Sequence, residues 1–406
     1  MKDTAFFERM LELKKPWWVK EVKLEIEKRK VEVVIECEAQ IWADPQTGER
    51  AHIHGYEERR WRHLDTMQFE TVLVARVPRV KYSDGKTEVV SVPWAQRHSR
   101  FTLMFEAWAI EVLKASRSVQ SGSELLKLSW HTAHTIMGSA VERGMERRDL
   151  EEIERIGIDE KSFGRGQDYI SVLSDIDAGR VLEVVPGRDK ASACALLETL
   201  NPQQRSQVKA VAMDMSGSYA AAVQQVLPEA DIVYDRFHVS KLLNEAVDQV
   251  RRGEHKTLME QGDETLKGTR QEWLFNPVNL TDARLESLAA LTRRNLKTAR
   301  AWLQKENFEG FWHLESQYAG EGYLKAWYRS AIHSRLDPIK RAARTIKAHA
   351  EGLLNYFKHK ITNAVTEGLN SRIQELKSAA RGFRNFTHYR IRILFFCGKL
   401  NLAPSI

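Results

Sequence analysis

Three carboxylates of this chain could form a metal-dependent catalytic site. Asp159 and Asp214 end apolar, strand-like runs, and Glu367 lies in a helical stretch. If the fold brings them together, repulsion between carboxylates costs roughly 4 kcal/mol per pair at 4 Å and an effective dielectric of 20, which cations offset. Two Mg²⁺ ions about 4 Å apart can activate a water or a 3′-hydroxyl and stabilise the leaving oxygen. The three acids therefore predict a catalytic Mg²⁺ site for cutting and joining DNA, in which Mn²⁺ can replace Mg²⁺.

Each acid taken alone also has a structural explanation, because acids at strand ends often cap turns. Asp214 is the strongest candidate: it follows the apolar run VKAVAM, where an ionised side chain is costly unless it is paired or bound to metal. The motif DRFH adds Asp235 and His238. These two either support the metal ligands or form a structural Asp–His hydrogen bond. Asn370 lies near Glu367 and is a further candidate for support of the site.

The elements that must position these acids have α/β character. The expected strands are 155–160, 169–177, 180–188, 208–215 and 230–239, and the expected helices are 190–200 and 220–228. The order β-β-β-α-β-α-β predicts a ribonuclease H-like sheet. In that topology Asp159 and Asp214 lie at the C-terminal ends of two adjacent strands.

The remaining chain divides by changes of hydrophobic period into modules around this core. The predicted domains are a β-rich DNA-binding module (1–100), a helix-turn-helix (101–150), the first part of the core (151–240), a large α-helical insertion (241–358) and the C-terminal part of the core (359–406). A folded insertion explains how Glu367 can lie so far along the chain and still join the site.

Basic and polar residues suggest where DNA binds. In the β-rich module, Arg59, Arg60 and Arg62 surround Trp61, either on phosphates or in a solvated charged turn. The segment 121–144 is typical of a helix-turn-helix, with Ser121 or Ser123 as N-cap, Leu125, Leu126 and Leu128 as the packing face, and a second helix from about 130 to 143. Its exposed side would offer His131, Thr132, His134 and Thr135 to base edges. A plain helical hairpin gives the same pattern.

The stretch 377–399 contains basic and aromatic residues and no acid. Lys377, Arg381 and Arg384 are its predicted DNA contacts, each phosphate contact adding about −0.9 to the salt dependence of binding. A solvated amphipathic helix is the alternative. The whole chain of 406 residues carries 62 Lys and Arg against 55 Asp and Glu, a net charge of +7, which favours a polyanionic partner.

Cysteine usage and the apolar pattern indicate the compartment. The three cysteines are too few and too scattered for a disulfide framework or a four-cysteine metal site. No apolar run is long enough to span a bilayer, and the first residues lack the apolar core of a signal peptide. We therefore expect a cytoplasmic, nucleoid-associated protein with no membrane partner.

Three segments resemble the transposases of bacterial insertion sequences of the ISL-three group: 158–189, 211–252 and 361–386. The resemblance covers essentially the whole chain. It implies a DDE transposase in which Asp159, Asp214 and Glu367 form the acidic triad, and in which DRFH is the acid-x-x-His motif after the fifth strand. It also implies an N-terminal zinc-ribbon-like module. Here only Cys37 remains of the expected CxxC pairs, so the sequence predicts a degenerate module without zinc.

The sequence thus predicts an enzyme that binds the terminal inverted repeats of an insertion sequence, cleaves DNA at the element ends and joins the 3′-hydroxyl to target DNA. We expect a homodimer or higher oligomer on DNA, because two ends must be brought together. Two rivals remain open at this point. One is a non-catalytic DNA-binding regulator descended from a transposase, and the other is a ribonuclease H-like nuclease that cuts without strand transfer.

Overall fold

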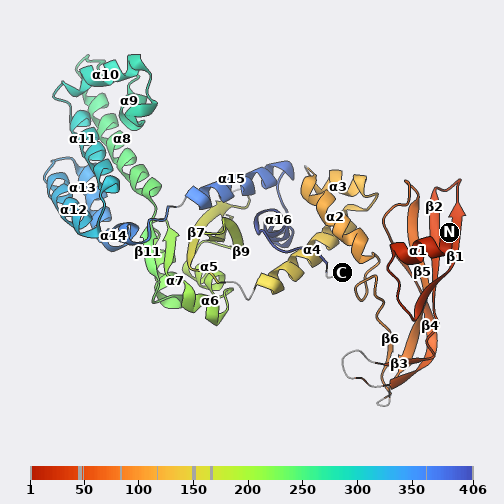
Figure 1. Ribbon diagram of the computed structural model, residues 1–406. Coiled ribbons are helices and arrows are strands. Elements are labelled where there is room, and N and C mark those ends of the chain that lie inside the picture. Colours follow the sequence, from red (N-terminus) through yellow and green to blue (C-terminus); the bar gives the residue numbers. More distant parts are fainter. Residues whose placement is uncertain are drawn as a thin grey trace. The chain divides into compact units, whose positions relative to one another are not determined.

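The computed structural model describes residues 2–43, 48, 50–82, 85–116, 118–148, 152–164, 168–362 and 364–404 (Figure 1). The chain forms two compact units. The first contains residues 1–148 and 400–406, and the second contains residues 149–399. No helix within the described residues is both long and apolar enough to cross a membrane.

The first unit begins with a sheet and continues into three helices. Its elements are α1 (Asp3–Met10), β1 (Trp17–Glu25), β2 (Lys30–Cys37), β3 (Ile41–Ala43), β4 (Arg50–Arg62), β5 (Glu70–Lys81), β6 (Thr87–Val89), α2 (Leu103–Ala115), α3 (Val119–Leu125) and α4 (Trp130–Arg148). The strands pair in the order β1-β2-β5-β4-β3, with β6 also on β5. Long strands with alternating burial, such as β2, place one face of the sheet on a core that includes Trp17, Trp61 and Trp94.

The end of the chain returns to this first unit. The guanidinium of Arg143 on α4 donates to the carbonyl of Leu402 at 3.0 Å, and that leucine is buried. Gly144 allows the close approach, because a Cβ atom there would lie 2.7 Å from Cβ of Leu400. Arg147 donates to the carbonyls of Asn401 and Ala403. The tail after residue 399 is therefore packed along the last helix of the unit.

The second unit is built on a five-stranded sheet. Its strands are β7 (Arg155–Ser162), β8 (Tyr169–Asp175), β9 (Arg180–Pro186), β10 (Ala210–Met213) and β11 (Asp231–Tyr234), in the order β11-β10-β7-β8-β9. The first three are antiparallel neighbours, and β10 is parallel to both β7 and β11. The helices between the strands are α5 (Lys190–Leu197), α6 (Pro202–Gln207) and α7 (Gly217–Val226). The predicted order of strands and helices is confirmed, with α6 as an extra short helix.

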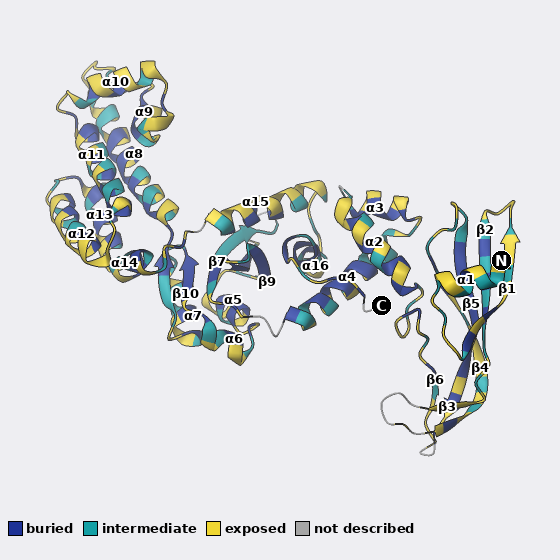
Figure 2. Cartoon of the chain, in the orientation of Figure 1, coloured by how far each residue is buried: buried dark blue, intermediate teal, exposed yellow. Residues whose placement is uncertain are grey.

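Helices cover both faces of this sheet. Along β10, Val211 and Met213 join the large core with α5 and α7, whereas Ala210 and Ala212 join a second cluster with Ile361 and Val365. The helices after the insertion are α15 (Ala364–Ala379), which packs on β7, and α16 (Phe386–Cys397), which packs on β9. The strands are largely buried, and the outer side of α15 is exposed (Figure 2).

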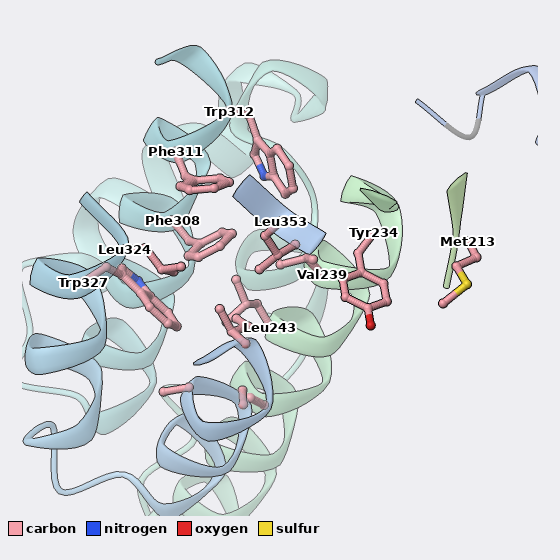
Figure 3. Packing of buried hydrophobic residues seen from close by; sticks show 14 of the residues in the cluster. Met213, Tyr234, Val239, Leu243, Phe308, Phe311, Trp312, Leu324, Trp327 and Leu353 are labelled. Carbon is pink, nitrogen blue, oxygen red and sulfur yellow. The ribbon is translucent and has the colours of Figure 1, made fainter. Parts of the chain in front are cut away.

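The segment between β11 and α15 is mostly helical, as predicted. Its elements are α8 (Arg236–Glu260), α9 (Arg270–Leu274), η1 (Pro277–Asn279), α10 (Asp282–Thr292), α11 (Lys297–Glu309), η2 (Gly310–His313), α12 (Gln317–Ile332), α13 (Asp337–Ala348) and α14 (Ala350–His359). Aromatic residues such as Phe308 and Trp327 share one apolar cluster with Val239 and Leu243 of α8 and with Met213 of the sheet (Figure 3). The helical segment is thus joined to the sheet by a continuous core.

Candidate active site

The register of the sheet places Asp159 and Asp214 side by side. In the parallel pair of β7 and β10, Ala212 lies opposite Gly157, so both acids come two residues after this pair. Asp214 directly follows β10, as predicted. Asp159 lies inside β7, which continues to Ser162, and the prediction of a strand-end position for Asp159 was wrong. The strand continues because Asp159, Glu160, Lys161 and Ser162 pair with β8 after β10 has ended.

Asp159 is partly buried and its carboxylate is held from two sides. The backbone N–H of Glu160 donates to Oδ1 at 2.7 Å, and Nδ2 of Asn370 donates to Oδ2 at 2.6 Å. Burial raises the pKa of Asp159 to about 6, and the charge of Asp214 raises it too, against the lowering effect of the two hydrogen bonds and of His238. A carboxyl beside a like charge in a partly buried place is typical of functional sites.

Asp214 and Asp235 follow neighbouring strands, and each accepts a hydrogen bond from the backbone that leads into the next helix. Oδ1 of Asp214 accepts from the backbone N–H of Ser216 at 3.1 Å. Asp235 follows β11 and caps α8 by accepting from the N–H of Phe237 at 3.2 Å. The DRFH motif therefore starts a helix, and the prediction that the fifth strand reaches 239 was wrong. Because Asp235 accepts from the start of α8, the chain turns out of the sheet there.

His238 faces the carboxylates from α8. Its Nδ1 lies 3.2 Å from Oδ2 of Asp235, so the Asp–His hydrogen bond is present. Asp235 raises the pKa of His238 most, burial lowers it, and the charges of Asp214 and Asp159 raise it further. The charge of Asp214 thus raises the pKa of both Asp159 and His238.

Glu367 lies on α15, next to a residue that joins this helix to the sheet by a hydrogen bond. The neighbouring Thr366 is buried, and its Oγ1 lies 3.1 Å from Oγ of Ser174 on β8. Asn370, one turn further on, contacts Asp159. The Glu367 side chain itself is exposed. Among the residues that the structure describes, no three His, Cys, Asp or Glu side chains gather as a metal-binding group. The structure brings together Asp159, Asp214, His238 and Asn370, and it does not assemble the three acids into one group.

The oxygen atoms around Asp159 are suited to bind a hard cation such as Mg²⁺. Oδ1 of Asn370 is buried and has no hydrogen-bond partner in the described part of the chain, although its amide nitrogen is fixed on Asp159. A buried carbonyl oxygen without a donor, on a residue that contacts the Asp159 carboxylate, matches the oxygen ligands that Mg²⁺ prefers. The one signal for this atom in the sequence is the nearness of Asn370 to Glu367.

The arginines around Trp61 lie in a strand. All three are part of β4, so the alternative of a solvated charged turn is wrong, because this segment pairs along its length with β5. Arg60 is exposed and forms an ion pair with Glu32 at 2.7 Å. Arg59 stacks on Trp61 with its guanidinium 5.2 Å from the ring centroid. Arg62 is largely buried, pairs with Asp65 and stacks on Phe105, so it mainly joins β4 to α2.

The helix-turn-helix is present with different details. Ser118, rather than Ser121 or Ser123, caps α3 by accepting from the N–H of Ser121. The prediction that Leu125 packs inside was wrong, because that side chain is 74% exposed, whereas Leu126 is buried and Leu128 is partly buried, as predicted. The second helix ends at Arg148. On it His131 and Thr135 are exposed, Thr132 is partly buried, and His134 stacks on Trp130.

The predicted DNA contacts at the end of α15 and just after it are one lysine that is hydrogen-bonded within the protein and two exposed arginines. Nζ of Lys377 donates to the carbonyl of Ser162 at 2.8 Å, which ties α15 to the end of β7. Arg381 and Arg384 are exposed in the connection to α16. In α16, Arg390 pairs with Glu183 and Arg392 is buried, so this helix packs on the sheet with two of its basic residues turned inward.

Comparison with known proteins gives three domain matches in chain order. A zinc-finger of the transposases of IS204, IS1001, IS1096 and IS1165 matches residues 42–84, the helix-turn-helix domain of transposase family ISL3 matches residues 90–141, and the transposase domain of the ISL3 family matches residues 156–393. The segment 42–84 contains no cysteine. Its three histidines include His63, whose Nδ1 lies 2.8 Å from Oγ1 of Thr102. The segment therefore offers imidazole nitrogens but no thiolate as possible zinc ligands.

Two kinds of relatives match over most of their length. The transposase for insertion sequence element IS1001 of Bordetella parapertussis is 27% identical over 372 residues, which cover 90% of this chain and 91% of the relative. The transposase for IS1557 of two Mycobacterium tuberculosis strains is 28% identical over 354 residues, which cover 80% of this chain and 79% of the relative. With the transposase domain covering more than half of its residues, the chain belongs to the ISL3 family of insertion-sequence DDE transposases.

Proposed function

We propose that this transposase cuts DNA at the terminal inverted repeats of its element and joins the exposed 3′-hydroxyl to target DNA in one Mg²⁺-dependent site. The observation that carries the proposal is the pairing of Asp159 and Asp214 on adjacent parallel strands with the oxygen of Asn370 beside them. The strands lie in the order β11-β10-β7-β8-β9 in the sheet. Along the chain, three antiparallel strands come first and two parallel strands follow, and this topology supports a ribonuclease H-like core.

Asp159, Asp214 and Glu367 are the proposed catalytic and metal-holding residues. Glu367 is three residues before Asn370, which corresponds to roughly 4.5 Å along the helix axis and about 60° around it. A change in the rotamer of Glu367 can therefore bring its carboxylate toward Asp159 without moving the helix, which the hydrogen bonds of Thr366 and Lys377 hold in place. The exposed carboxylate of Glu367 is free to make that change.

When bound, the metal ions would supply a nucleophile at neutral pH and stabilise the leaving oxygen. The chain's own residues position the substrate. His238, whose charged form is favoured by three aspartates, lies where it can meet a phosphate of the scissile strand. Asn370 and the N–H of Glu160 fix the orientation of Asp159, so that the site is organised before DNA arrives.

The test is a cleavage assay with DNA that carries the element's own ends, with and without Mg²⁺, in which every broken bond is mapped. Asp214→Asn should abolish cleavage and leave binding of the ends nearly unchanged. Asp282→Asn, which removes an exposed acid of α10, is the matched control and should cut normally. An active Asp214→Asn protein would remove that aspartate from the mechanism.

Joining is tested separately with a pre-cut end that carries a free 3′-hydroxyl. Strand transfer into a target duplex supports a transposase, whereas cleavage without transfer would indicate a nuclease. We also propose that a dimer or higher oligomer forms on DNA, because one site must act at each of two ends. Light scattering of complexes with paired ends should give at least two chains, and a single chain holding both ends would contradict this.

A further inference from the structure

A groove of about 710 Å³ lies between two segments of the first unit that are separate in the sequence. One wall is the loop Gln96–Phe101, which connects the sheet to α2. The other wall is formed by Ser129 and the first turns of α4, with His131, Thr132 and Thr135. The sequence prediction covered the helix wall alone and missed the loop, although the string QRHSR places three basic residues among five.

The charge of the groove is strongly positive. Arg97, His98 and Arg100 are exposed on the loop, and Lys127 stands at the entrance to α4. Arg97 pairs with Glu88 at 3.2 Å and Lys127 with Asp65 at 3.5 Å, yet each side chain is 60% exposed, so each remains accessible to a second anion. Glu106 also lines the groove, but its carboxylate is paired with Arg143 at 2.7 Å.

The loop is held in place by the strand beside it. The N–H of Arg62 donates to the carbonyl of Arg100 at 2.9 Å, and the N–H of Thr102 donates to the carbonyl of Arg62 at 3.0 Å. A turn closes between Gln96 and Ser99, with His98 in the left-handed region at φ 65°. Because the backbone is already fixed, little ordering entropy remains to be lost when a ligand binds.

Hydroxyl groups complete the opposite wall. Ser129 caps the start of α4 by accepting from the N–H of Thr132 at 3.1 Å, and Thr135 is exposed one turn further along. Hydroxyls, histidine and arginine are the groups that contact phosphate and sugar oxygens in DNA complexes. The groove is also too small for a whole duplex, so its dimensions suit one strand of a backbone.

We infer that this groove holds the sugar-phosphate backbone of one DNA strand, with the Gln96–Phe101 loop as a phosphate clamp that sets how α4 meets the base edges. The inference rests on the proposed binding of element ends by the transposase. It assigns the loop a positioning role, and it leaves the reading of sequence to the exposed side chains of α4.

The experiment compares the affinity of the full chain for an element-end duplex and for an unrelated duplex over a range of NaCl concentrations. The variants are Arg100→Ala and the double variant Arg97→Ala with Arg100→Ala. Arg9→Ala removes the same charge from an exposed position on α1 that does not line the groove, and it is the matched control. Arg100→Lys keeps the charge and checks that the loop still folds.

The clamp predicts that Arg100→Ala weakens both duplexes by a similar factor of roughly 10 and reduces the slope of log K against log salt by about 0.9 per lost phosphate contact. The double variant should lose about twice that slope, and Arg9→Ala and Arg100→Lys should behave like the parent protein. An unchanged slope overturns the inference, and so does a loss confined to the element end. Failure of the proposed cleavage would be seen separately in the Mg²⁺ assay and would leave these binding results intact.

Discussion

Each unit of the molecule contains an ionisable side chain that burial holds toward its neutral form. In the first unit burial lowers the pKa of His63 to about 4, with a further lowering by Arg62, and in the second unit burial raises the pKa of Asp159 to about 6. The surroundings differ. His63 meets the hydroxyl of Thr102, which also caps α2, and so links β4 to the helices. Asp159 instead lies near the charged carboxylate of Asp214.

This difference separates a structural group from a functional one. His63, a buried group with a pKa of about 4 that is hydrogen-bonded to Thr102, is part of the scaffold, and its removal should cost stability alone. A buried group that faces a like charge destabilises the fold, and such a cost is retained where function requires it. The two residues therefore predict opposite outcomes when each is replaced, and the following experiments are designed to break or sharpen that contrast.

The largest effect is expected for Asp159→Asn. Cleavage of element ends should fall by at least about 10³-fold, because a metal-holding carboxylate is lost. The free energy of unfolding should rise by about 1 kcal/mol at neutral pH, because the buried repulsion with Asp214 is removed. Both are measured on one preparation, by end mapping and by denaturant titration. A variant that is both inactive and less stable would place Asp159 in the scaffold with His63.

Glu367→Gln should reduce cleavage by about 10²- to 10³-fold with little change in stability, because Glu367 is exposed and its proposed role is limited to the reacting complex. Glu375→Gln changes another exposed acid of the same helix and is the control. Cleavage rates are compared at saturating DNA. Equal rates for the two variants would show that α15 contributes no acid to the chemistry.

The stability of the first unit should depend on pH through His63. The folded pKa lies below the unfolded value of about 6.5, so the unfolded chain binds the proton more readily and stability falls as pH drops from 6.5 toward 4. The expected loss between pH 7 and pH 5 is about 2 kcal/mol. Hydrogen exchange in β5 of the full chain reports it. His63→Gln should flatten this dependence while DNA cleavage at neutral pH persists, and an unchanged pH profile would assign the effect elsewhere.

The smallest effect is expected for Asn370→Ala, which removes the amide that holds Asp159. The Mg²⁺ concentration for half-maximal cleavage should rise by roughly 10-fold, with a smaller change in the rate at saturating Mg²⁺. Gln374→Ala, one turn further along α15, is the control. A loss of rate that added Mg²⁺ does not restore would mean that Asn370 acts on the substrate instead.

The sequence was informative where local pattern determines structure. Apolar runs and turn residues located the five strands of the second unit, and the position of Asp214 followed from one such run. Asp159 could not be placed as well, because the length of β7 depends on its antiparallel partner β8. The arginines of β4 looked like a turn for the same reason: charged residues form a strand there because β5 pairs with them.

The location of Glu367 and the groove beside α4 depended on contacts between distant segments. The position of α15 is determined by the tether of Thr366 to Ser174 and by Asn370 on Asp159, which no local pattern reveals. The Gln96–Phe101 loop becomes a wall of the groove only because backbone hydrogen bonds attach it to β4. Residues without a repeating pattern were therefore missed, even where their composition was unusual.

The packing of residues 401–403 against α4 has a consequence for the order in which parts of the protein can fold during synthesis. The first unit is formed by two separate stretches, residues 1–148 and 400–406, and the second unit is formed by the residues between them in the sequence. During synthesis, α4 can contact Leu402 only after the whole second unit has been made. A protein truncated before Leu402 would thus lack the hydrogen bond between that residue and Arg143 of α4.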